Sequence, residues 1–213
     1  LVATHVFQRM FWNQGQVCSA GTRLIVQRSV KERLIERIQA HIPQLKIGHP
    51  LDPATTFGPL ISGPQRDKVL SYISLGTEQG AQMRSGGTTP LGETGGFYVD
   101  PTIFTGVESS MRIAQEEIFG PVLSVLDFDD VDEAIGLANS TTYGLSAMAW
   151  TTNLGTAHRL IRDIQAGGIF LMATTTPTAG APFGSIPVEP HRQSGIGIEG
   201  GIEGLSSYVI SKS

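Results

Sequence analysis

The sequence has few of the features that mark specialised protein classes. Among its 213 residues there is one cysteine, Cys18, so an internal disulfide is impossible and we expect a reducing compartment, by default the cytoplasm. No apolar run approaches the roughly 20 residues of a membrane-spanning helix, and the first residues lack the cationic start and small-residue cleavage site of a signal peptide. We therefore expect neither a disulfide-stabilised secreted domain nor a membrane partner.

An excess of charge of one sign is also missing. The chain has 15 lysines and arginines against 19 aspartates and glutamates, which leaves a net charge of −4, and the cations are dispersed. A protein that binds nucleic acid usually carries a concentrated basic surface, so we expect no nucleic-acid partner. The histidines show no metal-ligand spacing, and we predict no metal site. They are His5, His41, His49, His158 and His191.

What is present is the composition of an ordinary globular chain. The sequence is 40% hydrophobic and 16% charged, and its length allows a sizeable core without disulfides or metal. The apolar spacing switches repeatedly between a period of two and a period near 3.6, which predicts strands alternating with helices. We therefore expect an α/β fold with an open, twisted, mostly parallel sheet flanked by helices.

The predicted elements follow from this spacing. Strands are predicted at 22–27, 120–128, 146–150 and 169–172. Helices are predicted after Ser29, at 65–79, after Asp129 or Asp130, and after Asn153. Ser29 and Glu32 have the spacing of a capping box. The region 120–128 is an apolar run with few charges, which is typical of a central strand covered on both faces.

The end of the chain predicts one more strand. Residues 207–211 (SYVIS) follow a Gly-rich stretch and have no hairpin partner beside them in the sequence. An unpaired terminal strand needs a sheet edge elsewhere, so we expect it to pair with a second copy of the chain in a homo-oligomer. The nearby Gly195–Gly200 segment satisfies G-x-G-x-x-G, but no predicted strand enters it and no predicted helix leaves it, which argues against a dinucleotide fingerprint.

The most informative segment surrounds the cysteine. Residues 11–23 read FWNQGQVCSAGTR, so Cys18 follows a polar, Gly-containing loop and precedes a predicted buried strand. A sulfur in that position lies at the mouth of a sheet, where a nucleophile is accessible. Local chemistry alone leaves a second interpretation open, because a lone cysteine is more often a small core residue.

This segment resembles the active-site cysteine motif of the aldehyde dehydrogenase superfamily. Further matches occur in that family's order and approximate spacing, and together they cover essentially the whole chain. They are Gly95-Gly96-Phe97 with Pro101-Thr102-Ile103, Glu116-Glu117-Ile118-Phe119-Gly120-Pro121-Val122, Ala138-Asn139-Ser140-Thr141, Tyr143-Gly144-Leu145, Ala181-Pro182-Phe183-Gly184 and Gln193-Ser194-Gly195-Ile196-Gly197.

The resemblance implies oxidation of an aldehyde to a carboxylic acid with reduction of NAD or NADP. Cys18 would be the nucleophile that forms a thiohemiacetal and then a thioester, and its backbone N–H would help to stabilise the oxyanion. A thiolate suits this chemistry because it is a strong nucleophile and a good leaving group. The aromatic residues Trp12, Phe170 and Phe183 are candidates for the aldehyde pocket, with burial in the core as the alternative.

Cofactor contacts also follow from the resemblance. Read from the residues alone, Glu116 and Glu117 are either an acid/base couple in which one pKa is raised or a solvated surface pair. The family instead matches Glu117 to a residue that binds the nicotinamide ribose hydroxyls and Phe119 to one that packs beside the nicotinamide. Gln65 and Lys68 fall near further ribose contacts, with an ordinary surface-helix role as the alternative.

The resemblance also indicates what lies outside the chain. The family's nucleotide-binding half, its general-base glutamate and the oxyanion-hole asparagine all precede the position that matches residue 1, so we expect the isolated chain to be inactive as a dehydrogenase.

We divide the chain into a catalytic domain, 1–195, and a tail with the oligomerisation strand, 196–213. The alternatives are a silent assembly module that pairs with a full-length relative, and a thiol-dependent esterase.

Three places depart from the family pattern. The segment 185–192 (SIPVEPHR) is longer than usual and contains two prolines. Met172 stands where an asparagine is usual, and Ile198 stands where an arginine is usual. We expect these differences to affect the substrate loop, local hydrogen bonding and the subunit interface.

Overall fold

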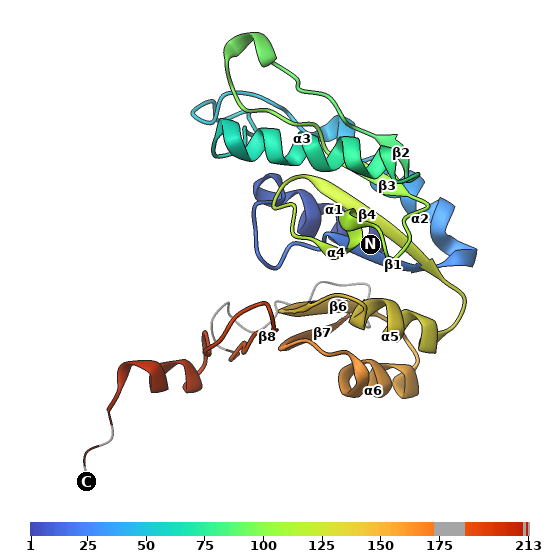
Figure 1. The fold of residues 1–213 in the computed structure, drawn as a ribbon, viewed down its shortest axis with the longest axis vertical. Coiled ribbons are helices and arrows are strands. Elements are labelled where there is room, and N and C mark those ends of the chain that lie inside the picture. Colours follow the sequence, from blue (N-terminus) through green and yellow to red (C-terminus); the bar gives the residue numbers. More distant parts are fainter. Residues whose placement is uncertain (173–185, 211, 213) are drawn as a thin grey trace. The chain divides into compact units, whose positions relative to one another are not determined.

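The computed structural model describes residues 1–172, 186–210 and 212 (Figure 1). The chain forms two compact units, Leu1–Leu137 and Ala138–Ser213. The boundary falls near the end of helix α5 (Val131–Asn139). No helix in the described ranges is long and apolar enough to cross a membrane.

The first unit alternates helices and strands, as the apolar spacing predicts. Its strands are β1 (Arg23–Gln27), β2 (Gln82–Ser85), β3 (Thr102–Thr105) and β4 (Val122–Phe128). Its α-helices are α1 (Val2–Phe11), α2 (Lys31–Gln39), α3 (Gly63–Glu78), α4 (Arg112–Gln115) and most of α5. Short 3-10 turns lie at η1 (Trp12–Gly15), η2 (Arg28–Val30), η3 (Ile42–Gln44) and η4 (Gly92–Thr94).

The four strands form one sheet in the order β1-β4-β3-β2. The pairs β1–β4 and β3–β4 are parallel, and β2 runs antiparallel to β3 at the edge. The predicted α/β class with a mostly parallel sheet is therefore confirmed. Strand β4 is central, and its first five residues are all buried, which is the physical reason for its apolar sequence.

Side chains of β4 alternate between two buried faces. Val122 and Leu126 belong to a cluster that also contains Val69 and Ile73 of α3 and Phe104 of β3. Leu123 and Val125 point to the opposite face because successive residues of a strand alternate, and both are at most 1% exposed. Figure 1 shows α3 along one side of this sheet, with α1 and α2 across it.

Two helix starts differ in how closely they follow the sequence patterns. Helix α3 begins after Ser62, whose hydroxyl accepts a hydrogen bond from the Gln65 N–H at 3.3 Å, which confirms the helix predicted at 65–79 and extends it to Gly63. The predicted capping box of Ser29 and Glu32 is wrong. Helix α2 begins without a side-chain cap, because Glu32 instead accepts a hydrogen bond from Arg84 at 2.8 Å.

The second unit contains small, local sheets. Strands β6 (Ser146–Trp150) and β7 (Gly168–Met172) pair in parallel, and β5 (Tyr143–Gly144) pairs with β8 (His191–Arg192). Helix α6 (Leu154–Asp163) is capped by Asn153, which accepts from the Thr156 N–H at 2.9 Å. The predicted strands and cap in this region are confirmed.

Within the segment 185–192, residues 186–192 are described, and Arg192 and Val188 hold them by hydrogen bonds. The Arg192 guanidinium donates to the carbonyl oxygens of Asn139, at 3.0 Å, and Thr141, at 2.6 Å, and also to the side-chain oxygen of Gln165. Val188 and Glu199 exchange backbone hydrogen bonds at 2.8 and 3.0 Å. The departure from the family pattern is therefore a tethered connection within this unit.

The strand predicted at 207–211 is wrong for residues 207 and 208, and within the described chain no strand forms there. Residues Glu203–Tyr208 form the 3-10 helix η5, and Val209 is extended but outside any sheet. Residue 211 lies outside the described residues. A strand requires a hydrogen-bonded neighbour, and none of the described strands pairs with this segment. Pairing with a second copy stays a prediction, as does the division of the chain at residue 195.

Candidate active site

The cysteine loop has a tightly defined backbone. After α1, Asn13 (φ 48°) and Gln14 (φ 56°) adopt left-handed conformations, and Gly15 (φ 70°) follows. The Asn13 side-chain amide donates to the Gln16 carbonyl at 3.1 Å and closes the turn. Each left-handed non-glycine residue costs about 1 kcal/mol, so surrounding contacts must hold this loop. Cys18 lies on the next turn, exposed, before β1.

The contacts that hold the loop come from a segment distant in sequence. A Cβ placed on Gly15 would lie 2.4 Å from the carbonyl oxygen of Gly120, and one on Gly120 would lie 2.4 Å from Val69 Cγ2. Only glycine allows this approach, because real side-chain carbons do not come so close. The cysteine loop, the residues before β4 and helix α3 are therefore packed directly on one another.

The segment before Gly120 carries two of the predicted cofactor residues. Glu117 is exposed, and the Phe119 side chain is half-buried on a left-handed backbone (φ 58°). Gln65 donates its amide nitrogen to the carbonyl oxygens of Ile118, at 3.0 Å, and Phe119, at 2.8 Å. Lys68 donates to the Glu117 carbonyl at 2.8 Å. The structure thus brings all four predicted cofactor residues together.

The roles of Gln65 and Lys68 in this structure are to hold backbone. Neither was expected to do so from the sequence, which suggested ribose contacts or a surface role. The contact uses one of the three ammonium donors of Lys68, so a further contact to a ligand remains open to it. Cofactor binding by Gln65, Lys68, Glu117 and Phe119 stays a prediction.

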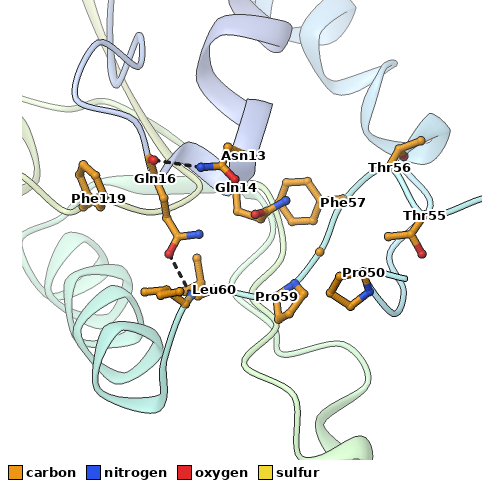
Figure 2. A pocket seen from close by; sticks show the side chains of 12 residues that line it. Asn13, Gln14, Gln16, Pro50, Thr55, Thr56, Phe57, Pro59, Leu60 and Phe119 are labelled. Atoms are coloured by element: carbon orange, nitrogen blue, oxygen red, sulfur yellow. Dashed lines mark hydrogen bonds between the residues drawn. The ribbon is translucent and has the colours of Figure 1, made fainter. Parts of the chain in front are cut away.

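An open groove of about 700 Å³ lies beside the cysteine loop. Figure 2 shows Asn13, Gln14 and Gln16 on one wall and Phe119 at one end. The Gln16 side-chain oxygen accepts from the Ile61 N–H at 3.0 Å and fixes the opposite wall. That wall is formed by the loop preceding α3 and includes Pro50, Thr55, Thr56, Phe57, Gly58, Pro59, Leu60 and Ile61.

Within the described residues, Cys18 has no hydrogen-bond or ion-pair partner for its thiol, and no acceptor takes its backbone N–H. The sulfur is exposed, so it is accessible to a reagent. The buried-core interpretation of the lone cysteine is wrong. No described carboxylate is placed to remove the thiol proton, and no group of possible metal ligands occurs among the described residues.

The aromatic candidates for the aldehyde pocket differ in how the structure places them. Trp12, in the cysteine loop, is 71% exposed, so it is not a core residue. Phe170 in the second unit is 42% exposed. Phe183 and the rest of 173–183 lie outside the described residues.

The acid/base interpretation is wrong for Glu116. Arg112 donates to both carboxylate oxygens of Glu116, at 2.6 and 2.8 Å, and the Tyr72 hydroxyl donates at 2.5 Å. These hydrogen bonds, first from Arg112 and then from Tyr72, lower the pKa of Glu116 to about 2. A carboxylate held in its charged form in this way is a poor proton donor near neutral pH.

The low pKa predicts a defined pH dependence of stability. A depressed pKa in the folded state stabilises the fold above the ordinary value of 4.5, and this contribution is lost as pH falls toward about 2. We expect Glu116→Gln to be less stable than the parent above pH 5, by no more than about 1 kcal/mol because the pair is partly exposed. The gap should close between pH 4.5 and 2 in urea unfolding.

Glu93→Gln is the matched control for this measurement. Glu93 is exposed and makes no ion pair with a described residue. Its variant should follow the parent across the same pH range. A gap for Glu116→Gln that persists unchanged at pH 2 would contradict the assignment of the Arg112 and Tyr72 contacts.

Several residues of the site carry no motif signal of their own. Tyr72 and Gln16 position the site through hydrogen bonds across long sequence separations, whereas Arg112 bonds Glu116 four residues further along. The local signals are that four-residue spacing and the spacing of Gln65, Lys68 and Tyr72, which places them on one face of a helix.

Comparison with known proteins gives a consistent result. The model of the aldehyde dehydrogenase family matches residues 1–213. The betaine aldehyde dehydrogenase of Mesorhizobium japonicum is 46% identical over 205 residues, which are 95% of this chain and 41% of that protein. The betaine aldehyde dehydrogenase of Brucella anthropi is 46% identical over 200 residues, which are 93% of this chain and 40% of that protein.

Solved structures share the fold. A P. syringae indole-3-acetaldehyde dehydrogenase variant in complex with NAD+ and IAA has a TM-score of 0.90 and 44% identity, covering 97% of this chain and 41% of that one. The betaine aldehyde dehydrogenase of Staphylococcus aureus in complex with NAD+ has a TM-score of 0.88 and 35% identity, covering 99% and 41%. The chain therefore spans about two fifths of the length of these relatives.

Proposed function

Because the chain belongs to the aldehyde dehydrogenase family, we propose that it is the catalytic part of an NAD(P)-dependent enzyme that oxidises an aldehyde to a carboxylic acid, with Cys18 as the nucleophile. The observation that carries this proposal is an exposed thiol on a loop packed by Gly15 against Gly120. The loop therefore joins the nucleophile to the segment that carries Glu117 and Phe119. Activity as a dehydrogenase requires the rest of the polypeptide.

The residues of this segment fit a nicotinamide nucleotide. Glu117 offers an exposed carboxylate, which can accept hydrogen bonds from both hydroxyls of a ribose. Phe119 lines the open groove with a half-buried ring suited to packing on an aromatic face. Bound NAD or NADP supplies the oxidant of the reaction. The two solved relatives named above are NAD+ complexes, which supports the choice of cofactor class.

The chain's own residues would perform the carbon chemistry. The Cys18 thiolate attacks the aldehyde carbonyl and forms a thiohemiacetal, and its free backbone N–H donates to the developing oxyanion. Oxidation converts this adduct to a thioester, and water releases the acid and restores the thiol. The general base comes from the part of the family sequence that precedes the match to residue 1.

The names of the relatives suggest the substrate range. Betaine aldehyde and indole-3-acetaldehyde differ in charge and size, so we propose a small or medium aldehyde as the substrate class. The exposed Trp12 side chain, in the cysteine loop, is a candidate to contact it. We also propose a homo-oligomer, on the basis of the exposed apolar residues Leu205, Tyr208, Val209 and Ile210 near the end of the chain.

A thiol-dependent esterase is the second candidate function. It is favoured by the same exposure of Cys18 and its free backbone N–H, because acyl transfer from an activated ester to a thiolate needs no nucleotide. The isolated chain can therefore be assayed for acylation even where it lacks dehydrogenase activity.

Alkylation of Cys18 tests the proposal on the isolated chain. We expect iodoacetamide to react with the native thiol at least as fast as with the thiol in denaturant between pH 6 and 9, because the sulfur is exposed and its loop is held rigid. An apparent pKa below about 8.5 in the rate profile would show that this chain also activates the thiol. Native alkylation slower than unfolded alkylation at every pH would instead favour a silent assembly module.

A further inference from the structure

Side chains on one face of helix α3 bond successive residues of the segment 116–119. Gln65, Lys68 and Tyr72 are three and four positions apart, so their side chains project from the same face. Tyr72 bonds the Glu116 carboxylate, Lys68 bonds the Glu117 carbonyl, and Gln65 bonds the next two carbonyls. Three side chains of one helix therefore bind four consecutive residues.

The segment 116–119 needs external support. It has no regular secondary structure, and Phe119 adopts φ 58°. A non-glycine residue in that region is strained unless its surroundings determine it. The carbonyls of Ile118 and Phe119, on either side of the Phe119 Cα, accept hydrogen bonds from Gln65. Helix α3 therefore supplies contacts that offset the backbone strain at Phe119.

Tyr72 and Arg112 hold Glu116, the first residue of the segment 116–119. The Tyr72 ring packs against the buried cluster of the first unit. Two cations also lie over this ring, with Lys68 Nζ 5.9 Å and Arg112 Cζ 5.6 Å from its centroid. The Arg112 fork and the Tyr72 hydroxyl together occupy both oxygens of Glu116. Bidentate pairs of this kind fix orientation as well as distance.

Fixing Glu116 sets the direction of its neighbour. Glu116 has an extended backbone (φ −111°, ψ 149°), and successive side chains of an extended chain point to opposite sides. With the Glu116 carboxylate held toward α3, the Glu117 side chain is turned away from the helix, which agrees with its exposure.

We propose that Tyr72 and Arg112 are positioning residues that act through Glu116 to place the Glu117 carboxylate and the Phe119 ring for the nicotinamide nucleotide. This inference rests on the proposed function, because it takes Glu117 and Phe119 as the cofactor contacts. It adds residues that touch neither cofactor nor substrate and that act by holding the course of the backbone.

The test compares Tyr72→Phe and Arg112→Gln in the dehydrogenase polypeptide that contains this chain. Each variant removes charge-assisted hydrogen bonds to Glu116, and we expect the KM for NAD+ to rise about tenfold while kcat changes less than about threefold. Acylation of Cys18 by p-nitrophenyl acetate without nucleotide should be unchanged. Arg112→Lys should recover part of the KM effect, because lysine keeps the charge but not the fork.

Ser74→Ala is the matched control on the same helix. Ser74 also donates to a glutamate, Glu78 at 2.9 Å, but this pair lies within α3 and does not touch 116–119. Its KM for NAD+ should equal that of the parent. A normal KM in an active Tyr72→Phe variant would overturn the positioning role and leave the proposed function standing. A parent that oxidises no aldehyde with NAD+ would instead remove the proposed function.

A second measurement needs no activity. A glutamate-specific protease should cut the isolated Tyr72→Phe chain after Glu117 several-fold faster than the parent, because the segment is released. Cleavage after the exposed Glu93 serves as the internal reference and should not change. Equal cleavage after Glu117 in the parent and the variant would show that Tyr72 does not hold the segment, and would overturn the inference independently of any dehydrogenase assay.

Discussion

Replacing Cys18 with alanine is expected to lower the rate of acylation by p-nitrophenyl acetate at least about 10³-fold, because loss of the nucleophile leaves only weak residual catalysis. The same variant of the complete dehydrogenase should lose NAD+-dependent aldehyde oxidation to a similar or larger extent. Since this is the only cysteine in the chain, the variant should also incorporate no iodoacetamide. The measurement is initial rate with and without nucleotide.

The stability of the Cys18→Ala variant distinguishes loss of chemistry from loss of fold. Cys18 is exposed and has no partner for its thiol among the described residues, so we expect a change within about 0.5 kcal/mol in urea unfolding. Ser19→Ala, one residue further along, is the control that should retain the acylation rate. Retained acylation in Cys18→Ala would show that another group carries the reaction and would remove the assignment of the nucleophile.

Replacing Gly15 with alanine is expected to give the largest loss of stability. The new Cβ would meet the carbonyl oxygen of Gly120 at 2.4 Å and its carbon at 2.7 Å, both backbone atoms that cannot turn aside. The left-handed φ of 70° adds strain for any side chain. Together we expect a cost of roughly 3 kcal/mol, measured by urea unfolding. The loop should move, and Cys18 acylation should fall with it.

Substitutions at two other glycines separate backbone strain from steric overlap as causes of this loss of stability. Gly80 has φ 95° but open space around its Cβ position, so Gly80→Ala reports backbone strain alone. Gly21, close to Cys18, has neither a positive φ nor a neighbour within 4 Å, so Gly21→Ala should cost little. If Gly15→Ala were no worse than Gly80→Ala, the close approach of the cysteine loop to Gly120 would not hold the site together.

Many of the secondary-structure elements and the family of this chain can be predicted from its sequence. The apolar spacing predicts the strands β1, β4, β6 and β7 and the helices α2, α3, α5 and α6, because burial imposes a period of two on strands and 3.6 on helices. The residues around Cys18 and the Glu117–Phe119 segment indicate the family, and the comparisons confirm it. These signals are local, so each can be recognised without knowing what lies beside it in space.

The partners of polar side chains depend instead on the fold. Glu32 matches a capping box but pairs with Arg84, and Glu116 matches an acid/base couple but is bound by Arg112 and Tyr72. The contact between Glu32 and Arg84 spans 52 positions and that between Tyr72 and Glu116 spans 44, whereas Arg112 lies four residues before Glu116. A local pattern specifies what a side chain can bond, whereas the packing of α3 and β2 specifies which group it meets.

The same distinction explains the active site and the chain's last segment. Residues 207–211 have the composition of a strand, but a strand forms only where a neighbouring strand offers hydrogen bonds, and no described strand does so. Cys18 is recognisable from its motif, yet its connection to Phe119 runs through Gly15, Gly120 and Gln65. That connection exists because Gly15 lets its loop approach the Gly120 backbone and Gly120 lies against the Val69 side chain, and a periodic apolar pattern does not specify such close approaches.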